Sequence, residues 1–347
     1  MTESDGASGA GARRATIREV AALAGVGIKT VSRVINDEPN VSALMHRKVM
    51  QAIRELDYHP NHNAVALNRS GGKTGTIGLV VSNVANRFWA TLHRGVEDMA
   101  NERGVDVLAS SLDDDEERED RVIGKHLQRR VDALILAPAR HDQSRLAVEQ
   151  QRGTPLVFVD RDPVGIEADV VLTNDRSAAQ QAVAHLVGHG HRSIAFLGDR
   201  PGIWPTEQRR LGFYDALSEA GIPSASATLV QDLRDTDAAR AATLALLTRS
   251  DRPTAIFSSQ NSITVGALHA LRELGLENTI AIVGFNDVAL GDLISPGLTA
   301  MVQNPYQMGR IAASRAFARL DGDDTAQRIV LRSALVIRGS GEIRPPR

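Results

Sequence analysis

Hydrophobic residues recur with two different spacings along this chain. Up to about residue 59 they recur every three or four positions, a spacing that predicts short amphipathic helices. From Thr76 onward, short apolar runs alternate with helical patterns. Each run is rich in Val, Ile and Leu and is bounded by turn residues, which is typical of buried strands in parallel sheets. The runs are TIGLVV, VDVLAS, ALILAP, PLVFVD, SIAFLGD, TAIFSS and TIAIVGF.

Helical patterns separate these runs, so the second part of the chain alternates between strands and helices. This alternation predicts an α/β body of parallel sheets with helices on both faces, and the number of strands predicts two doubly wound subdomains. The segments LTAMVQNPYQMGRIAASRAF and RIVLRSALVIR return near the end to complete them. The expected helices are Phe88–Arg103, Glu117–Arg130, Ala178–His189, Gln208–Ala220, Ala238–Thr248 and Ser262–Leu274.

The first part of the chain reads as a small all-α head. Thr16 and Glu19 have the spacing of a capping box, which starts a helix. Gly25-Val26-Gly27 interrupts the pattern, a second periodic stretch covers 28–36, and a third begins after Ser42. Two short helices joined by a glycine-containing turn and braced by a third predict a helix-turn-helix domain. We expect the third helix to bury one face, formed by Leu44, Met45, Val49, Ile53 and Leu56.

The second helix of the head has an aliphatic face and a polar, cationic face. The aliphatic face, which can pack on the neighbouring helices, is formed by Val31, Val34 and Ile35. The polar face suits a DNA groove, since lysine and arginine donate to guanine and hydroxyls reach phosphates. A solvated surface helix would show the same pattern, so this helix alone leaves both interpretations open.

The distribution of charge favours a nucleic-acid partner for the head. Residues 13–73 contain ten Lys or Arg against five Asp or Glu, which gives this segment a net charge of +5. Because the whole chain has a net charge of −2, the remaining residues have a net charge of −7. A locally basic segment on an otherwise acidic chain indicates an anionic partner for that segment.

A further short helix is predicted after Pro60, over Asn61–Asn68, and Ser70-Gly71-Gly72 ends it. About two turns of helix are not stable alone, so we expect a partner or DNA to order this segment. Few other apolar residues lie near Leu67 in this segment. It is either a packing residue or a wedge between base pairs in the minor groove. The expected organisation is a tail at 1–14, the helix-turn-helix domain at 15–59, a hinge helix and linker at 60–74, and the two-subdomain body at 75–347.

These segments together resemble the lactose/galactose-repressor (LacI/GalR) family of bacterial transcriptional regulators. The similarity is carried by TIREVAALAGVGIKTVSRVIN, VSALMHRKVMQAIRELDYHPN and AVALNRSGGKTGTIGLVV, and it extends through nearly the whole chain after the tail. The resemblance implies that the second helix reads the major groove and that paired hinge helices of a dimer insert leucines into the minor groove. It also implies a body similar to periplasmic sugar-binding proteins, with an effector between the subdomains.

Carried over to this chain, the resemblance implies that Ile28, Lys29 and Arg33 read bases. Thr30, Ser32 and Asn36 would support phosphate or base-edge contacts, and Leu67 would be the wedge. The chain departs from the family pattern at Gly27, where an N-capping serine or threonine is usual, and at Val65, where an arginine is common. The full set of predicted DNA-contacting residues is Thr16, Ile28, Lys29, Thr30, Ser32, Arg33, Asn36, Asn61, Ala64 and Leu67.

Polar and aromatic residues follow most of the predicted strands, where ligands of open α/β sheets bind. Singly, each is better explained as a turn or cap residue than as a ligand contact, but together they describe a pocket for a small hydroxylated ring. The resemblance implies effector contacts for most of them. Departures from the family pattern make the pocket less acidic and place Arg87 where a proline is usual. The predicted effector-binding residues are Asn86, Phe88, Asp160, Trp204, Arg209, Gln260 and Asn286.

Neither a metal site nor a cofactor is predicted. The acidic run DDDEERED, Asp113–Asp120, has no histidine partner in sequence, and acids at the start of a helix are favoured by its dipole. We therefore expect the run to form a solvated face. His189-Gly190-His191 is the one close histidine pair and lies in a turn, and the chain has no cysteine.

Three function classes follow from these patterns, and a ligand-responsive transcriptional regulator, most often a repressor in the family, fits best. Its effector is expected to be a sugar or sugar derivative; a nucleobase or nucleoside is the alternative, because Phe88 and Trp204 could stack on a flat ring. A sugar-binding protein without a regulatory role would carry an export signal and no basic head. An enzyme is disfavoured, since G-x-S-x-G and G-x-G-x-x-G motifs are missing and SGGKTG at 70–75 lacks a preceding strand.

The expected assembly is a cytoplasmic homodimer on double-stranded operator DNA, without a membrane association. No apolar run approaches the roughly 18 residues of a membrane span. A two-fold operator needs two heads, which predicts a dimer. The chain carries no added heptad helix after the last predicted strand, so a tetramer is not expected.

Overall fold

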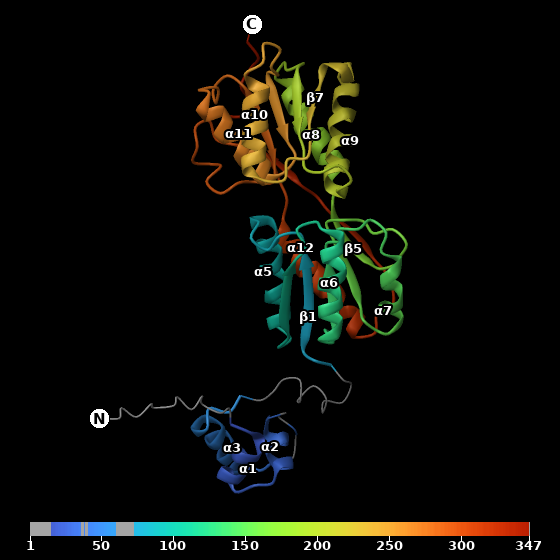
Figure 1. The fold of residues 1–347 in the computed structure, drawn as a ribbon, viewed down its shortest axis with the longest axis vertical. Helices are drawn as coiled ribbons and strands as arrows, with labels where there is room; N and C mark the ends of the chain where they lie inside the picture. The colour runs from blue at the N-terminus through green and yellow to red at the C-terminus, as the bar shows by residue number, and fades with distance from the viewer. Residues whose placement is uncertain (1–14, 36–37, 39–40, 60–72, 347) are drawn as a thin grey trace, which may run out of the picture. The chain divides into compact units, whose positions relative to one another are not determined.

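The computed structural model describes residues 15–35, 38, 41–59 and 73–346, which belong to two compact units that divide after Gly75. The first unit is the helical head, with α1 (Ile17–Ala24), α2 (Ile28–Ile35) and α3 (Ala43–Glu55) (Figure 1). Its helices pack around a small aliphatic core: Val20, Ala21, Ala24, Val31, Val34, Val49 and Ala52. The predicted fold class, an all-α head and an α/β body of two parallel-sheet subdomains, is confirmed.

Local sequence signals start and end the helices of the head. The backbone amide of Thr16 donates to the Glu19 carboxylate over 2.6 Å, and the amide of Glu19 donates back to the Thr16 hydroxyl over 3.4 Å, which is the predicted capping box. Gly25 ends α1 in the left-handed region at φ 65°. Glycine adopts this conformation without steric strain because it has no Cβ atom. The chain therefore turns sharply from α1 into α2.

Two apolar residues of α3 are more exposed than the pattern predicted. Leu44 and Met45 are 56% and 39% exposed, so the predicted buried face of α3 is wrong at its first turn. The reason is that α3 faces the other two helices only from Val49 onward, where Val49 and Ala52 are buried.

The second unit begins with a six-stranded sheet in which all neighbouring strands are parallel, in the order β11-β5-β4-β3-β1-β2. The helices α5 (Arg87–Asn101) and α12 (Pro305–Leu320) cover one face, and α6 (Glu116–Gln128) covers the other. A 3₁₀ turn, η1 (Ser144–Leu146), leads into the short α7 (Ala147–Gln151). The strands are β1 (Thr76–Val81), β2 (Asp106–Ser111), β3 (Ala133–Leu136), β4 (Leu156–Val159), β5 (Asp169–Thr173) and β11 (Arg328–Leu331).

The other subdomain repeats this plan with the order β12-β10-β9-β8-β6-β7, in which only the β10–β12 pair is antiparallel. The helices α8 (Asp175–Gly188) and α9 (Trp204–Glu219) cover one face, and α10 (Thr236–Leu247) and α11 (Asn261–Glu273) cover the other. The strands are β6 (Ile194–Leu197), β7 (Thr228–Val230), β8 (Ala255–Ser258), β9 (Ala281–Phe285), β10 (Thr299–Val302) and β12 (Ala334–Val336), with η2 (Ser224–Ser226) before β7.

Sequence patterns missed two of these strands and placed the starts of two helices three or four residues too late. β5 and β7 were not among the predicted runs: β7 is a three-residue edge strand that is only half-buried, and β5 is a short run between acidic and polar residues. Helix α8 starts at Asp175 rather than at Ala178. Helix α9 starts at Trp204 rather than at Gln208, because Pro205 stands in its first turn, where a proline needs no hydrogen bond.

The chain crosses between the two subdomains three times, after β5, after β10 and after β11. Each subdomain is therefore assembled from separate stretches of sequence. The carboxyl ends of the parallel strands in both sheets lie where the two subdomains face each other, as Figure 1 shows. This arrangement sets the loops of both sheets opposite one another, where ligands of such sheets bind.

Helices α5 and α12 approach each other through two glycines. A Cβ added at Gly95 would lie well inside 3.0 Å of the Tyr306 carbonyl oxygen, and one added at Gly309 would do the same at the carbonyl of Leu92. The two backbones are thus in direct contact. Helix α12 starts three residues after β10. The contact with α5 therefore holds the segment after β10, where the chain crosses to the first subdomain, against the first sheet.

The described residues contain neither a membrane-spanning helix nor a cluster of metal ligands. None of the described helices combines the length and the apolar character that crossing a membrane requires. Across the same residues, no group of three or more His, Asp or Glu is placed to hold a metal ion.

Replacing Gly309 with alanine should destabilise the body, because its methyl group must push α12 away from α5. Overpacking of this kind costs about 1–3 kcal/mol. Gly124 in α6 is the matched control, since a Cβ there meets nothing within 4 Å and alanine favours helices by about 0.5–1 kcal/mol. Thermal unfolding followed by circular dichroism should give a lower Tm for Gly309→Ala and an equal or higher Tm for Gly124→Ala. Equal effects of the two substitutions would contradict the close approach.

Candidate functional site

The outer face of α2 in the head presents the residues that the sequence predicted for DNA contact. Lys29 and Arg33 are exposed, and Ile28 is 46% exposed although it is aliphatic. Thr30 and Ser32 are half-buried at the edge of this face. Among the described residues, Arg33 pairs with the Glu38 carboxylate at 3.6 Å, and both side chains are about half exposed. A screened surface pair of this kind is weak and leaves the guanidinium available to a stronger acceptor.

The remaining predicted DNA contacts have different positions. Thr16 uses its side chain and backbone in the cap of α1. Four of the predicted residues lie outside the described part of the chain: Asn36, Asn61, Ala64 and Leu67. Their roles stay predictions.

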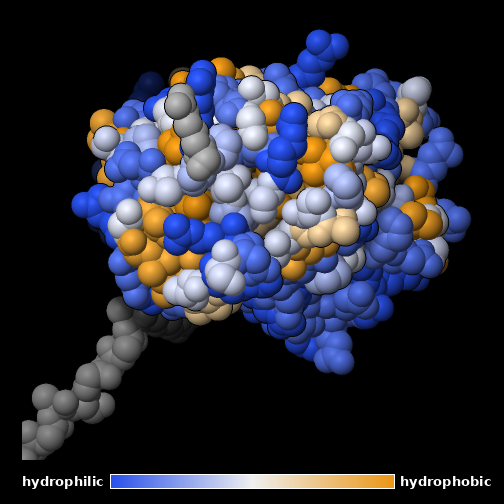
Figure 2. Space-filling view, turned by 90° about the horizontal axis from the view of Figure 1, so that it is seen from above, coloured by the Kyte–Doolittle hydropathy of each residue, from blue (hydrophilic) through white to orange (hydrophobic). Residues whose placement is uncertain are grey.

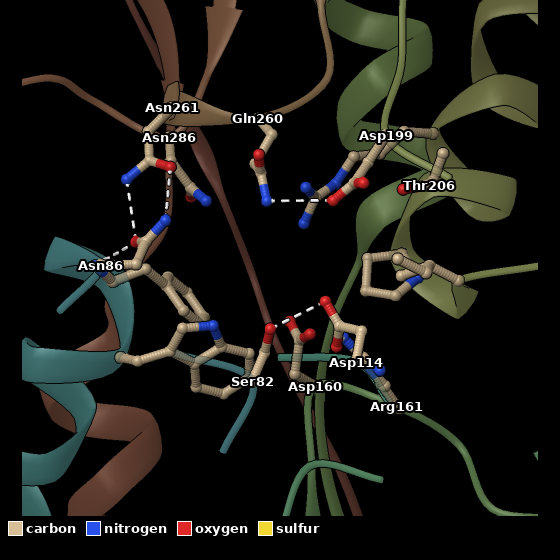
Figure 3. Close-up of a pocket in the computed structure, with 15 residues that line it drawn as sticks. Ser82, Asn86, Asp114, Asp160, Arg161, Asp199, Thr206, Gln260, Asn261 and Asn286 are labelled. Carbon is tan, nitrogen blue, oxygen red and sulfur yellow. Dashed lines mark hydrogen bonds and ion pairs between the residues drawn. The ribbon is translucent and has the colours of Figure 1, made fainter. Parts of the chain in front are cut away.

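A pocket lies in the cleft of the second unit, where the strand ends of both sheets meet (Figure 3). We call it the effector pocket. Six of the seven predicted effector-binding residues line it: Asn86, Phe88, Asp160, Arg209, Gln260 and Asn286. The residues that the prediction did not include are Ser82, Trp89, Asp114, Arg161, Asp199, Ile203, Pro205, Thr206 and Asn261.

Two pocket residues stand at equivalent positions of the two sheets. Asp160 follows β4 and Asn286 follows β9, and these strands have the same place in their sheets. Both residues have φ 66°, in the left-handed region that residues other than glycine seldom adopt. The Arg161 amide donates to the Val159 carbonyl over 2.7 Å, so Asp160 is the central residue of a tight turn. Such conformations cluster at functional sites, where they aim a side chain.

Asp160 brings a buried carboxyl group into the pocket. The residue is 5% exposed, and burial raises its pKa to about 6, with Asp175 adding to the rise and Arg209 and Arg161 opposing it. Among the described contacts, none gives the carboxylate of Asp160 a hydrogen bond or an ion pair. A buried carboxylate without donors is costly, so a ligand that brings hydroxyl donors would be favoured.

Asp114 lines the same pocket but is already paired. Its carboxylate accepts from the Ser82 hydroxyl over 2.8 Å and forms an ion pair with Arg161. Burial alone would raise the pKa of Asp114, but Arg161 and Ser82 outweigh it and hold that pKa below its usual range. Arg161 is 6% exposed, and its Nε has no partner among the described residues, which leaves one buried donor at the pocket.

The expectation that the acidic run forms a solvated face is therefore wrong at two positions. Asp114 lines the pocket, because it follows β2 at the carboxyl edge of the sheet. Glu119 is fully buried, because it turns inward from α6 and accepts from the backbone amides of Ala139 and Arg140. The other acidic residues of the run are exposed: Asp113, Asp115, Glu116, Glu117 and Asp120.

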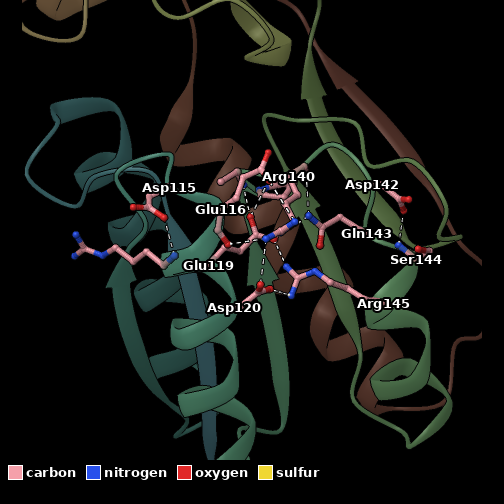
Figure 4. A network of polar contacts seen from close by, with 12 residues as sticks. Asp115, Glu116, Glu119, Asp120, Arg140, Asp142, Gln143, Ser144 and Arg145 are labelled. Atoms are coloured by element: carbon pink, nitrogen blue, oxygen red, sulfur yellow. Dashed lines mark hydrogen bonds and ion pairs between the residues drawn. The ribbon is translucent and has the colours of Figure 1, made fainter.

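Glu119 is the centre of the polar network that Figure 4 shows. Besides the two amides, it accepts from the side chains of Gln143 and Arg145, and Asp120 also pairs with Arg145. The network holds the loop after β3 on α6. Since this loop carries the Pro138 carbonyl, which accepts from Arg161 over 2.7 Å, it supports one wall of the pocket.

On the other side of the pocket, Asp199 follows β6 and Gln260 follows β8. The Gln260 amide donates to the Asp199 carboxylate over 3.2 Å, and the Arg200 backbone amide donates to the same group over 2.7 Å. Burial is the main reason that the pKa of Asp199 is raised. Asp160 and Asp199 thus supply two carboxyl groups that strong donors have not saturated.

Arg209 connects the pocket to the first crossing of the chain. Its guanidinium pairs with Asp175 at 2.6 Å, donates to the Ser259 carbonyl over 2.7 Å and stacks 3.9 Å from the centre of the Phe285 ring. The side chains of Arg209 and Asp175 are 6% and 2% exposed. These three contacts hold the guanidinium in place, so its orientation toward the pocket is set before any ligand binds.

Direct contacts also join the two subdomains across the cleft. The side-chain amides of Asn86 and Asn261 donate to each other, both over 3.0 Å, and Figure 3 shows them face to face. Arg200 reaches across to the Asp113 carbonyl at 3.1 Å and the Asp114 carboxylate at 3.3 Å. These contacts are partly solvated hydrogen bonds, each worth about 0.5–1.5 kcal/mol, so the cleft is held closed by a modest free energy.

Trp204 does not line the effector pocket. Its ring stacks on His141, with ring centroids 6.1 Å apart, and borders a separate groove beside β5 and β11. Trp89 lines the pocket together with Phe88, on whose ring it packs edge-to-face. The sequence signal for Trp89 was its position beside Phe88 at the start of α5, and the signals for Asp199 and Asn261 were their positions directly after strands.

The chain was compared with known protein families and structures. Residues 16–61 match the model of bacterial regulatory proteins of the lacI family, and residues 183–341 match the periplasmic binding protein-like domain. The HTH-type transcriptional regulator DegA of Bacillus subtilis is 33% identical, with 94% of this chain and 98% of that protein covered. The ribose operon repressor of Escherichia coli is 32% identical, with 94% and 99% covered.

Among solved structures, the Lac repressor dimer bound to operator and the anti-inducer ONPF matches with a TM-score of 0.80 at 26% identity. The match covers 95% of this chain and 99% of that one. Relatives above 30% identity match over nearly the whole chain, and both family models fall on the units described above. The chain therefore belongs to the lacI family of bacterial regulatory proteins, which are DNA-binding transcriptional regulators and not enzymes.

Proposed function

We propose that this chain is a transcriptional repressor whose affinity for operator DNA is switched by a sugar or sugar derivative in the effector pocket. The observation that carries the effector part is the buried, unpartnered carboxyl group of Asp160 beside the fixed guanidinium of Arg209. A carboxylate accepts from vicinal hydroxyls, and a guanidinium donates to hydroxyl or ring oxygens. The name of the ribose operon repressor supports a sugar.

A nucleobase or nucleoside is less well supported. A flat base needs aromatic faces to stack on, and Trp204, which could have supplied one, stacks on His141 outside the pocket. Phe88 and Trp89 meet edge-to-face at 86°, which does not form a slot for a planar ring. The polar lining that remains suits a hydroxylated ligand.

The switch would act through the cleft. A ligand that binds differently to the closed and the open cleft shifts the equilibrium between them. The first sheet starts at Thr76, directly after the linker, so movement of this subdomain would be passed along the chain to the hinge segment and the head. This is allostery between two distinct sites, with the closing of the cleft as the two-state element.

The active species is proposed to be a homodimer. Three large apolar side chains between β9 and β10 face solvent in the single chain: Leu290, Leu293 and Ile294, at 66%, 74% and 39% exposure. Figure 2 shows that the end of this subdomain carries separate apolar patches among hydrophilic areas. Exposed apolar residues of this size favour a partner surface, and the Lac repressor in the matching structure is a dimer.

Selection from a randomised DNA pool, followed by sequencing, tests the DNA-binding function. A dimer with two heads should enrich a pseudo-palindrome with a flexible central pyrimidine–purine step, and Leu67→Ala should weaken binding to it.

Arg33→Ala should lower the affinity for the selected DNA by about 1–3 kcal/mol and relax one position of each half-site. Arg129→Ala, an equal charge change on the body, is the control. Failure to enrich any sequence, with binding that falls only with salt, would contradict specific recognition.

The affinity of the effector pocket for its sugar should depend on pH through Asp160. Hydroxyl donors bind the ionised carboxyl group, so affinity should rise as pH increases through about 6 and level off above it. Calorimetric titration from pH 5 to 8 measures this. Asp160→Asn should bind weakly and lose the pH dependence between 5 and 7, while Asp237→Asn, on the exposed first turn of α10, should behave as wild type. A wild-type affinity that is flat across this range would contradict the role of Asp160.

A further inference from the structure

A hollow with basic walls lies between α6 and β2, and we call it the basic groove. It has a volume of about 510 Å³, which is within the range of small-molecule sites. Strand β2 is the last strand of its sheet, so no other strand of the described sheet covers that side of the groove. The described residues that line the groove include no acid but four cations: Arg118, Arg121, Lys125 and Arg129.

The charges of α6 are divided between two faces of the helix. The four cations recur every three or four residues, so they form one row along the groove. Glu116, Glu119 and Asp120 lie on the opposite face, where they pair with Arg140 and Arg145. These acids therefore do not neutralise the cations of the groove.

The cations of the groove have few acidic partners of their own. Lys125 and Arg129 are exposed and have no hydrogen bond or ion pair among the described contacts. Arg118 has one close acidic partner, but Arg121 lies 3.9 Å from a Glu117 carboxylate that is 87% exposed, which is a weak pair. Like charges one helical turn apart repel each other, so a bound anion would remove an unfavourable interaction.

Ser110 adds a hydroxyl donor to the groove. Its Oγ lies 3.0 Å from Nε2 of His126, a ring that is 1% exposed. Burial and the charge of Arg129 lower the pKa of His126 to about 4, so the ring is neutral and carries one N–H proton. Nδ1 is buried without a partner among the described residues, and a buried N–H is seldom left unpaired, so we assign the proton to Nε2. His126 then donates to Ser110, which leaves the hydroxyl proton of Ser110 for a ligand.

The row of cations is longer than a single phosphate group. Arg118 and Arg129 are 11 residues apart, and a helix rises about 1.5 Å per residue, so the row extends over about 16 Å. A ligand with more than one anionic group can contact several of these cations at once. Phosphate oxygens accept the paired donors of arginine as well as hydroxyl donors. Leu108 and Val122, which also line the groove, can pack on the uncharged part of such a molecule.

We propose that the basic groove binds a small molecule that carries two or more phosphate groups. The backbone of DNA has the same phosphate chemistry, but a duplex presents a broad convex surface, whereas the groove is a hollow lined by half-buried serine hydroxyls. The inference is independent of the proposed sugar site, since the groove and the effector pocket share no lining residue. The chain would thus respond to a second class of ligand.

Calorimetric titration of the purified full-length chain with sodium tripolyphosphate tests the proposal. Inorganic phosphate at the same ionic strength is the comparison anion. Tripolyphosphate should saturate one site per chain and bind about tenfold or more tightly than inorganic phosphate, because it contacts several cations at once. Binding that does not saturate, or that is no tighter than the binding of inorganic phosphate, would overturn the proposal.

Two variants locate the anion in the groove. Lys125→Ala and Arg129→Ala should each weaken tripolyphosphate binding about tenfold, as expected for the loss of one hydrogen bond to a charged group. The matched control is Arg252→Ala, since Arg252 is also exposed and has no hydrogen bond or ion pair among the described contacts. An unchanged Kd in both groove variants, or an equal loss in the control, would contradict the site. A larger loss in Arg33→Ala would place the anion on the head instead and would also contradict it.

The operator Kd distinguishes a small phosphorylated ligand from the phosphates of DNA. At one fixed salt concentration, Lys125→Ala and Arg129→Ala should bind the selected operator as the wild-type chain does, because the proposed DNA contacts lie on the head. Weaker operator binding in both variants would assign the groove to the DNA backbone and exclude the small-molecule site. Circular dichroism of each variant shows whether a loss of binding reflects loss of fold.

Discussion

The buried ion pair between Arg209 and Asp175 joins the parts of the molecule on which regulation depends. Arg209 lines the effector pocket, and Asp175 starts α8 directly after the first crossing between the subdomains. Thr173 and Gln303, from the first and second crossings, continue the same hydrogen-bonded chain. Removing one partner would leave an uncompensated buried charge, which typically costs about 3–5 kcal/mol. In the proposed switch, these buried contacts would carry a change at the pocket to the hinge.

Closure of the cleft depends on weaker contacts than the hinge does. The Asn86–Asn261 amide pair and the contacts of Arg200 are partly solvated, and each can be replaced by contacts to a ligand at small cost. A strong hinge with weak closing contacts is the combination that allows two states of similar free energy.

Much of the fold could be predicted from the sequence, because repeated local signals specify it. The capping box at Thr16, the glycine turn at Gly25 and the alternation of apolar runs with helical patterns all define elements that the structure contains. The buried face of α3 was harder to predict, since Leu44 and Met45 have the right spacing but extend beyond the small core.

The pocket was only partly predictable, because a strand end shows where a side chain starts but not where it points. Six of the seven predicted effector residues line the cavity. Trp204 does not, since it pairs with His141 from the other subdomain, a contact that no spacing reveals. Asp114 was hidden in a run of exposed acids, and its burial depends on Arg161 and Ser82, which are distant in sequence. The pairing of side chains across the cleft is set by tertiary structure alone.

The coupling between pocket and head is most directly tested by the Kd of the selected operator, measured with and without the sugar that binds the purified chain. Saturating sugar should change the operator Kd at least tenfold, equivalent to about 1.4 kcal/mol of coupling. In Asp160→Asn the operator Kd should be that of the free wild-type chain at every sugar concentration. An operator Kd that stays the same in the wild-type chain with the pocket filled would contradict a regulator switched by its effector.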